Sequence, residues 1–291
     1  MVINTLKHNY YVIHKLEENQ ELEALLCKEV TPQEGKDPDQ RYRVIRLKNL
    51  PLTYQVLPFF MELLNSREFT DYYDCFSKDG CLHLVFLQQD YPLLVDKLER
   101  ERCDLRERLE IGKKLLSRIL MQNMPDFILY DALAKESLCV SPSLEVAFRY
   151  SLASLADYRT IGISQVRQRL VPVFLALFDY ELQKEASVDI EEFIEGLRIR
   201  DYRSYVDIYR EYDGLYGRLV SGGLIAKIKP RTFLFRLWDR IKSLFKYMKA
   251  VVAALLLIAI AAYLIYTIYN QPVDTATVFN YNQIGTVWIE E

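Results

Sequence analysis

Few residues of this chain combine a type and a spacing that could do chemistry. Lys48 ends a strand-like run, and Glu62 falls in the helix-like segment after it. Asp131 and Glu136 lie close together beyond a long helical segment. Phosphoryl transfer uses lysine and carboxylate side chains to position phosphate, hold magnesium and accept a hydroxyl proton. A lysine at a strand end and an acid in a loop are common features. Whether these four residues form one site therefore depends on the elements that position them.

No other catalytic constellation competes with these four residues. The histidines His8, His14 and His83 are scattered near strand-like runs, and the sequence lacks GxSxG, HExxH and phosphate-binding glycine-loop motifs. The five cysteines show neither CxxC nor Cys/His ligand spacing. We therefore expect no disulfide framework, no metal site and no cofactor, and a reducing compartment.

Residues 1–92 are predicted to form a small antiparallel sheet with one helix. Short apolar-rich runs separated by polar stretches favour strands, and the turn-forming Lys78-Asp79-Gly80 lies between the last two. The expected order is strands at 10–16, 24–30 and 42–48, a helix at 57–64, and strands at 69–76 and 81–88.

Residues 93–223 are predicted to be mostly helical. Asp104 is a favourable N-cap for a long amphipathic helix that begins at Leu105. The Ser221-Gly222-Gly223 stretch is typical of a hinge after the last helix. Between these points we expect two short strands at 137–141 and 144–150, then helices at 163–183, 189–195 and 201–220.

The last of these helices carries tyrosines at alternating spacings of three and four. The stripe consists of Tyr202, Tyr205, Tyr209, Tyr212, Tyr216 and Leu219. Such a seam fits either a face between two copies in a homodimer or packing of the helix onto its own domain. In the second case the tyrosine hydroxyls need polar partners at the rim.

The order of elements resembles that of a protein kinase up to its magnesium-binding loop. Ile45-Arg46-Leu47-Lys48 resembles the VAIK strand, and Glu62 lies where the carboxylate partner of the lysine is expected. Leu129–Glu136 fills the slot of the HRDLxxxN catalytic loop, with Asp131 at the aspartate and Glu136 at the asparagine. The resemblance implies an α+β, protein-kinase-like two-lobe domain, with a small antiparallel-sheet N-lobe and a reduced helical C-lobe.

Residues 88–92 would then form the hinge between the lobes, but the rest of the phosphoryl-transfer machinery is missing. The first hairpin turn, residues 17–21, has no glycine and carries three acids that would repel a triphosphate. The DFG position falls at Phe148-Arg149-Tyr150, which has no aspartate. We therefore expect a pseudokinase and no enzyme, with Lys48 and Asp131 as vestiges. The alternative is a receptor-type membrane Ser/Thr kinase with residual ATP binding.

The uncharged stretch 250–269 is long enough to span a bilayer as one transmembrane helix. The preceding residues 224–249 are rich in Lys and Arg, whereas residues 270–291 have none. This asymmetry predicts a single-pass cell-membrane protein with a cytoplasmic N-terminal domain and an extracytoplasmic tail. The basic segment has helical spacing that favours contact with the lipid bilayer. Its membrane-surface basic residues are Arg236, Arg240, Lys242, Lys246 and Lys249.

A kinase-like domain followed by one span is similar to the membrane pseudokinases of Gram-positive type VII secretion systems, the EssB/YukC family. The resemblance implies a non-catalytic scaffold that dimerises and docks other membrane or cytoplasmic secretion components. That family carries a sizeable extracytoplasmic domain, whereas here only residues 270–291 follow the predicted span. A tail-anchored adaptor without kinase ancestry is the remaining alternative. Nucleic acid is not an expected partner, because the basic residues gather beside the predicted span.

Overall fold

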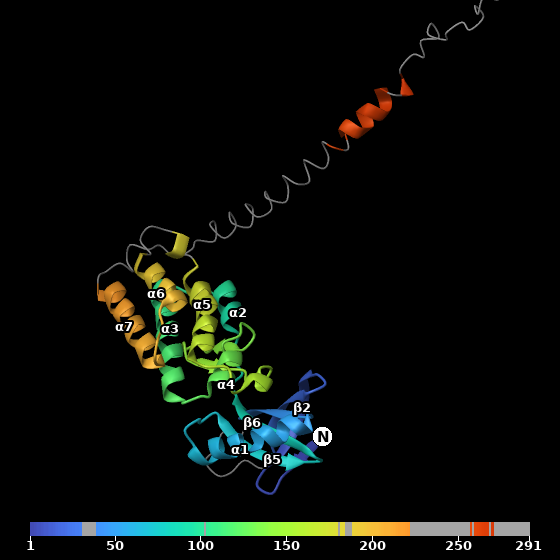
Figure 1. Ribbon diagram of the computed structural model, residues 1–291, viewed down its shortest axis with the longest axis vertical. Coiled ribbons are helices and arrows are strands. Elements are labelled where there is room, and N and C mark those ends of the chain that lie inside the picture. Colours follow the sequence, from blue (N-terminus) through green and yellow to red (C-terminus); the bar gives the residue numbers. More distant parts are fainter. Residues whose placement is uncertain are drawn as a thin grey trace, which may run out of the picture. The chain divides into compact units, whose positions relative to one another are not determined.

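The computed structural model describes residues 1–30, 39–101, 103–179, 181–183 and 188–221, and from the C-terminal part residues 257, 259–267 and 269–270 (Figure 1). The chain divides into two compact units, Met1–Pro230 and Arg231–Glu291. The first unit consists of an antiparallel sheet with one helix, followed by a helical part.

The sheet has six strands in the order β1-β2-β3-β4-β6-β5, and every neighbouring pair is antiparallel. The strands are β1 (Val2–Asn4), β2 (Asn9–Glu18), β3 (Leu22–Glu29), β4 (Arg41–Leu47), β5 (Tyr72–Lys78) and β6 (Cys81–Gln88). At the end of β5, Lys78 Nζ donates a 3.4 Å hydrogen bond to the carbonyl of Asn4 in β1. The two outermost strands therefore approach each other, and the sheet is curled.

Both faces of the sheet are apolar. Successive side chains of a strand point to opposite faces. On β4 and β6, Ile45 and Phe86 belong to the large core that the sheet shares with the helices. Tyr42, Val44 and Val85 belong to a smaller core on the other face, inside the curl.

Helix α1 (Leu50–Ser66) connects β4 to β5 and packs on the large-core face. Its start is fixed by Asn49, whose side chain accepts a 3.2 Å hydrogen bond from the backbone N–H of Leu52. Pro58 lies inside the helix and not at its start. The predicted helix at 57–64 is therefore too short, because the capping residue and not the proline sets the boundary.

The helical part follows β6. Its elements are α2 (Leu94–Arg100), α3 (Leu105–Met121), α4 (Asp126–Ala132), β7 (Leu138–Val140), β8 (Val146–Phe148), the 3-10 turn η1 (Leu155–Asp157), α5 (Ile163–Phe178), η2 (Glu181–Gln183), α6 (Val188–Ile199) and α7 (Tyr205–Ser221). The predicted N-cap of α3 is confirmed, since Asp104 accepts from the N–H of Glu107 in a capping box. Helix α4 occupies residues that the kinase resemblance assigned to a loop.

The predicted fold class is wrong in one respect, the transmembrane helix at 250–269. Spanning the hydrocarbon core takes about 20 residues of apolar helix. Among the described residues, no helix has both the length and the apolar character to cross a membrane. The remainder of that stretch, the basic residues Arg236, Arg240, Lys242, Lys246 and Lys249, and the tail beyond Asn270 lie outside the described residues.

His83 on β6 is a buried titratable residue of the sheet. Its ring is 4 % exposed and stacks on Phe76, with ring centroids 4.8 Å apart. Burial lowers the pKa of His83 to about 4, although a hydrogen bond with the Cys81 carbonyl opposes the shift. The unfolded chain protonates this histidine near pH 6.5, so its contribution to stability is present above about pH 6.5 and is lost as pH falls toward 4.

We therefore expect the free energy of unfolding, measured by urea denaturation, to fall between about pH 7 and pH 5 partly through this residue. A His83→Phe variant keeps a ring beside Phe76 but cannot titrate, so it should lose less stability than the unmodified protein over the same range. Equal losses in the two proteins would show that His83 does not couple folding to protons.

Candidate functional site

Lys48 lies just beyond β4 and is used to hold the hairpin between β2 and β3. Its Nζ lies 2.6 Å from Glu18 Oε1 and donates to the Asn19 carbonyl at 3.3 Å. Two lysine contacts lower the pKa of Glu18 to about 2, the larger from Lys15 and the second from Lys48. Glu62 is exposed on α1, and among the described residues no ion pair joins it to Lys48. The structure thus does not bring together the predicted lysine–carboxylate pair.

Arg43 in β4 faces the helical part, whereas Lys48 does not. It pairs across the sheet with Phe86, a member of the large core, so both side chains lie on the same face. The Arg43 side chain is 11 % exposed and its Nη2 lies 3.9 Å from Glu17 Oε2. Burial lowers the pKa of Arg43, Glu17 opposes this shift, and the charge of Arg149 adds to it.

Arg149 binds one backbone carbonyl of the predicted hinge. It follows β8, at the position that the kinase resemblance assigns to the DFG motif, and its Nη2 donates to the Tyr91 carbonyl at 3.1 Å. The next residue, Tyr150, is fully buried, and its hydroxyl donates to Asp71 Oδ2, which also accepts from Arg118 Nη2 at 2.7 Å. This anchor between the sheet and the helical part directs the neighbouring Arg149 toward the hinge.

Asp131 lies in the last turn of α4 and its side chain is engaged inside the helical part. The carboxylate accepts two hydrogen bonds from Ser154, from the backbone N–H at 2.9 Å and from Oγ at 2.7 Å. Burial raises the pKa of Asp131, against the lowering effect of those hydrogen bonds. Glu136 is exposed while Asp131 is 6 % exposed, so the two acids do not converge on one site.

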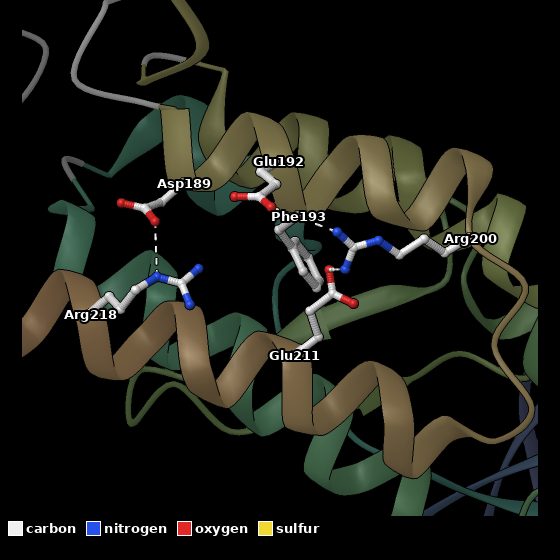
Figure 2. Close-up of a pocket in the computed structure, with 6 residues that line it drawn as sticks. All are labelled: Asp189, Glu192, Phe193, Arg200, Glu211 and Arg218. Carbon is white, nitrogen blue, oxygen red and sulfur yellow. Dashed lines mark hydrogen bonds and ion pairs between the residues drawn. The ribbon is translucent and has the colours of Figure 1, made fainter.

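A small charged pocket lies between α6 and α7, with a volume of about 240 Å³. Its lining consists of Asp189, Glu192, Phe193, Arg200, Glu211 and Arg218. Figure 2 shows the Phe193 ring between two ion pairs that join the helices. Arg218 Nε lies 2.9 Å from Asp189 Oδ1. Arg200 Nη1 lies 2.8 Å from Glu211 Oε1.

Ion pairs among the three acids and two arginines of this pocket clamp α6 to α7. Arg200 also lies 3.7 Å from Glu192, and Glu211 raises the pKa of Arg200. Helix α7 can approach this closely because residue 196 is glycine. A Cβ there would lie 2.8 Å from Glu211 Oε1 and 3.0 Å from the Tyr202 hydroxyl. The arrangement is that of a helix–helix contact held by ion pairs.

The tyrosine stripe of α7 packs onto the same domain. Its hydroxyls find the polar partners expected for that case. Tyr202 donates to Glu211, Tyr205 to Asp126, Tyr212 to the Leu109 carbonyl and Tyr216 to Glu110. Tyr209 packs against the large core at partial burial, and Leu219 is fully buried. The stripe therefore serves an intramolecular seam, mainly with α3, and its buried members are not available to a second copy.

The described residues contain no group of three or more His, Cys, Asp or Glu side chains arranged to hold a metal ion. No protein-family model matches the sequence, and no curated protein matches it.

The sequence analysis does not identify three side chains that contact the predicted site residues: Arg43, Arg149, which donates to the Tyr91 carbonyl, and Ser154, which binds Asp131. The two-residue alternation along β4 contains the signal for Arg43, because Leu47 faces inward and the next residue, Lys48, must face outward. No local pattern marks the contacts of Arg149 and Ser154, since they depend on partners distant in the sequence.

Proposed function

We propose that this chain is a non-catalytic, kinase-like docking protein, and that it serves as a component of a type VII secretion assembly. The kinase-like part of the proposal is supported by the element order. Apart from the short β1, five antiparallel strands, β2 to β6, have α1 inserted after β4, and α2, α3, α4 and the β7–β8 hairpin follow. The secretion part rests on the resemblance to the EssB/YukC family.

The observation that carries the non-catalytic assignment is the position of Asp131. A catalytic base must reach the hydroxyl proton of its substrate. Asp131 is buried and binds both the N–H and the hydroxyl of Ser154. The Asp131 carboxylate therefore satisfies the polar groups of Ser154 and stabilises the helical part. It is not presented to the hydroxyl group of a phosphate acceptor.

The surroundings of the interlobe region support the same assignment. Arg149 donates to the Tyr91 carbonyl, which makes this backbone acceptor of the predicted hinge less accessible to an adenine ring. Lys48 is paired with Glu18 at the hairpin, where carboxylates would repel the phosphates. A protein with this arrangement works through its surfaces.

The proposal predicts no stabilisation of the full chain by ATP and magnesium. A ligand present at 100 times its dissociation constant stabilises a protein by about 2.7 kcal/mol, so binding would raise the melting temperature measurably. In a thermal-shift titration to millimolar ATP with Mg²⁺, we expect an unchanged midpoint, with an active protein kinase as the positive control.

The Lys48→Met variant decides the meaning of any stabilisation. If ATP raises the midpoint of the unmodified protein and Lys48→Met abolishes the rise, the chain has residual kinase-type nucleotide binding and the proposal fails.

The secretion role is tested separately by the neighbouring genes. An ESX-type ATPase and small WXG-type proteins beside this gene would support it, and their absence would remove it.

A further inference from the structure

A groove runs between the two edges of the curled sheet. Strands β1 and β5 are the terminal strands, so each has one side without a neighbouring strand. The space between them has a volume of about 610 Å³ and is lined by residues 4–7 after β1, residues 74–78 of β5 and one flank of α1. Helix α1 and β5 lie side by side in Figure 1.

The edge of β5 has no neighbouring strand and is open to strand pairing, except at the N–H of Cys75, which donates to the Asp74 carboxylate. An edge strand presents a row of main-chain N–H and C=O groups that can bind another strand, and proteins usually block it by shortening, charging or bulging. Strand β1 is only 3 residues long. Strand β5 has 7 residues, and its irregularity lies at the start, between Tyr72 and Asp74. From Cys75 to Lys78 its pairing with β6 is regular.

The charged side chains along the groove, apart from Asp74, are basic, and the others are apolar or uncharged polar. Leu6 is fully exposed, Met61 is 41 % exposed, and Phe76 is partly buried. Lys7 and Lys78 also line the groove, and within the described residues neither forms an ion pair.

Asp74 is the acid of this lining, and it is turned inward. It is 8 % exposed, and its carboxylate accepts from the Tyr10 hydroxyl at 3.4 Å and from the N–H of Cys75 at 2.8 Å. The charge presented to a ligand is therefore positive, from the two lysines. An apolar floor, a basic rim and an open strand edge together select an extended chain with apolar and acidic side chains.

We propose that the groove between β1 and β5 binds an extended, acidic-apolar peptide segment of a partner protein, which adds a strand to the β5 edge. Residues 74–78 would pair with about five residues of the partner at roughly 3.3 Å each. Alternate apolar side chains would contact Leu6, Met61 and Phe76, and acidic side chains would approach Lys7 and Lys78. This inference rests on the proposed docking function and names the surface that performs it.

The test uses the full chain, labelled with a fluorophore, on an array of immobilised peptides of about eight residues in which Val, Ile or Phe alternates with Glu or Asp. Two matched arrays replace the acids by Lys, or place Pro at the centre, which removes a main-chain donor needed for strand pairing. We expect binding to the acidic array at least about tenfold above both matched arrays.

Three variants locate the binding. Leu6→Glu and Lys78→Glu place negative charge in the groove and should each weaken binding to the acidic array by about tenfold or more. Tyr54→Glu adds the same charge to an exposed position of α1 outside the groove lining, and should leave binding unchanged. Since Leu6 is on the surface, its substitution tests the groove without disturbing the core.

Hydrogen exchange distinguishes strand addition from looser contact. With a soluble acidic peptide bound, the amides of residues 74–78 should exchange more slowly, while those of α7 keep their rates. Equal binding to acidic and lysine arrays, unchanged binding by Leu6→Glu, or no protection of β5 would overturn the inference. If the amides of β5 exchange slowly without peptide and light scattering shows a dimer, the β5 edges of two copies pair with each other, and the inference is overturned. The peptide-binding results do not depend on whether ATP stabilises the protein. Failure of the groove proposal and failure of the non-catalytic assignment can therefore be told apart.

Discussion

Replacing Glu181 by alanine is expected to lower the free energy of unfolding by about 3–5 kcal/mol, because it leaves a buried guanidinium without its counter-ion. The Glu181 side chain in η2 is fully buried, and the Arg108 side chain in α3 is 9 % exposed. Arg108 Nη1 donates to Glu181 Oε2 at 2.7 Å and to the Leu177 carbonyl at 2.8 Å. Two planar groups thus meet in a bidentate pair at the end of α5, and neither can reach water when its partner is removed.

Chemical denaturation followed by circular dichroism measures this effect. The matched control is Asp189→Ala, which breaks the half-exposed ion pair with Arg218 and should cost about 1 kcal/mol or less. A double variant, Arg108→Met with Glu181→Leu, removes both charges and should be more stable than Glu181→Ala alone. A loss for Glu181→Ala no larger than that of Asp189→Ala would mean that the buried pair is not a main contributor to stability.

Replacing Gly112 by alanine is expected to destabilise the protein by about 1–3 kcal/mol, because the added methyl group has no room. Gly112 lies in α3 where α7 crosses it, and a Cβ there would overlap the hydroxyl and ring of Tyr212 and lie 3.0 Å from Phe174. Tyr212 is fully buried and donates to the Leu109 carbonyl at 2.8 Å. Moving its ring would break that hydrogen bond as well as the packing.

Gly217 in α7 provides a control for which we expect the same substitution to raise the free energy of unfolding. A Cβ at this position has no atom within 4 Å, so Gly217→Ala should stabilise the protein by about 1 kcal/mol through helix propensity. Combining Gly112→Ala with Tyr212→Phe removes the nearest clashing atom and should recover part of the loss in a double-mutant cycle. If Gly112→Ala and Gly217→Ala change the unfolding free energy alike, close packing of α7 on α3 is not what requires the glycine.

Local patterns in the sequence predict much of the fold. Local patterns mark five strands of the sheet and the two strands of the β7–β8 hairpin, and the capping residue Asp104 marks the start of α3. The elements that were missed are short, as with β1 and α4, and their stability comes from the surrounding packing. The start of α1 was misplaced because Pro58 is a strong local signal, although a helix held by an N-cap and by packing tolerates it.

The candidate site was harder to predict than the fold. The residue types at 48 and 131 fit a known motif, but a motif does not fix which way a side chain points. Arg43 and Lys48 are five residues apart, so the two-residue alternation along β4 places Arg43 inside and Lys48 outside. Asp131 was expected in a loop, yet the buried apolar residues Phe127, Ile128 and Leu129 fold the segment into α4.

The sequence by itself determined the α+β order, the absence of a glycine loop and of a DFG aspartate, and the tyrosine stripe that needs a partner surface. Only the tertiary structure decided where the remaining polar groups go. Asp131 and Ser154 are 23 residues apart, Tyr91 and Arg149 58, and Arg108 and Glu181 73. The physical reason is that burial obliges each polar group to find a partner, while local periodicity encodes only that a residue is buried and not which distant group will satisfy it.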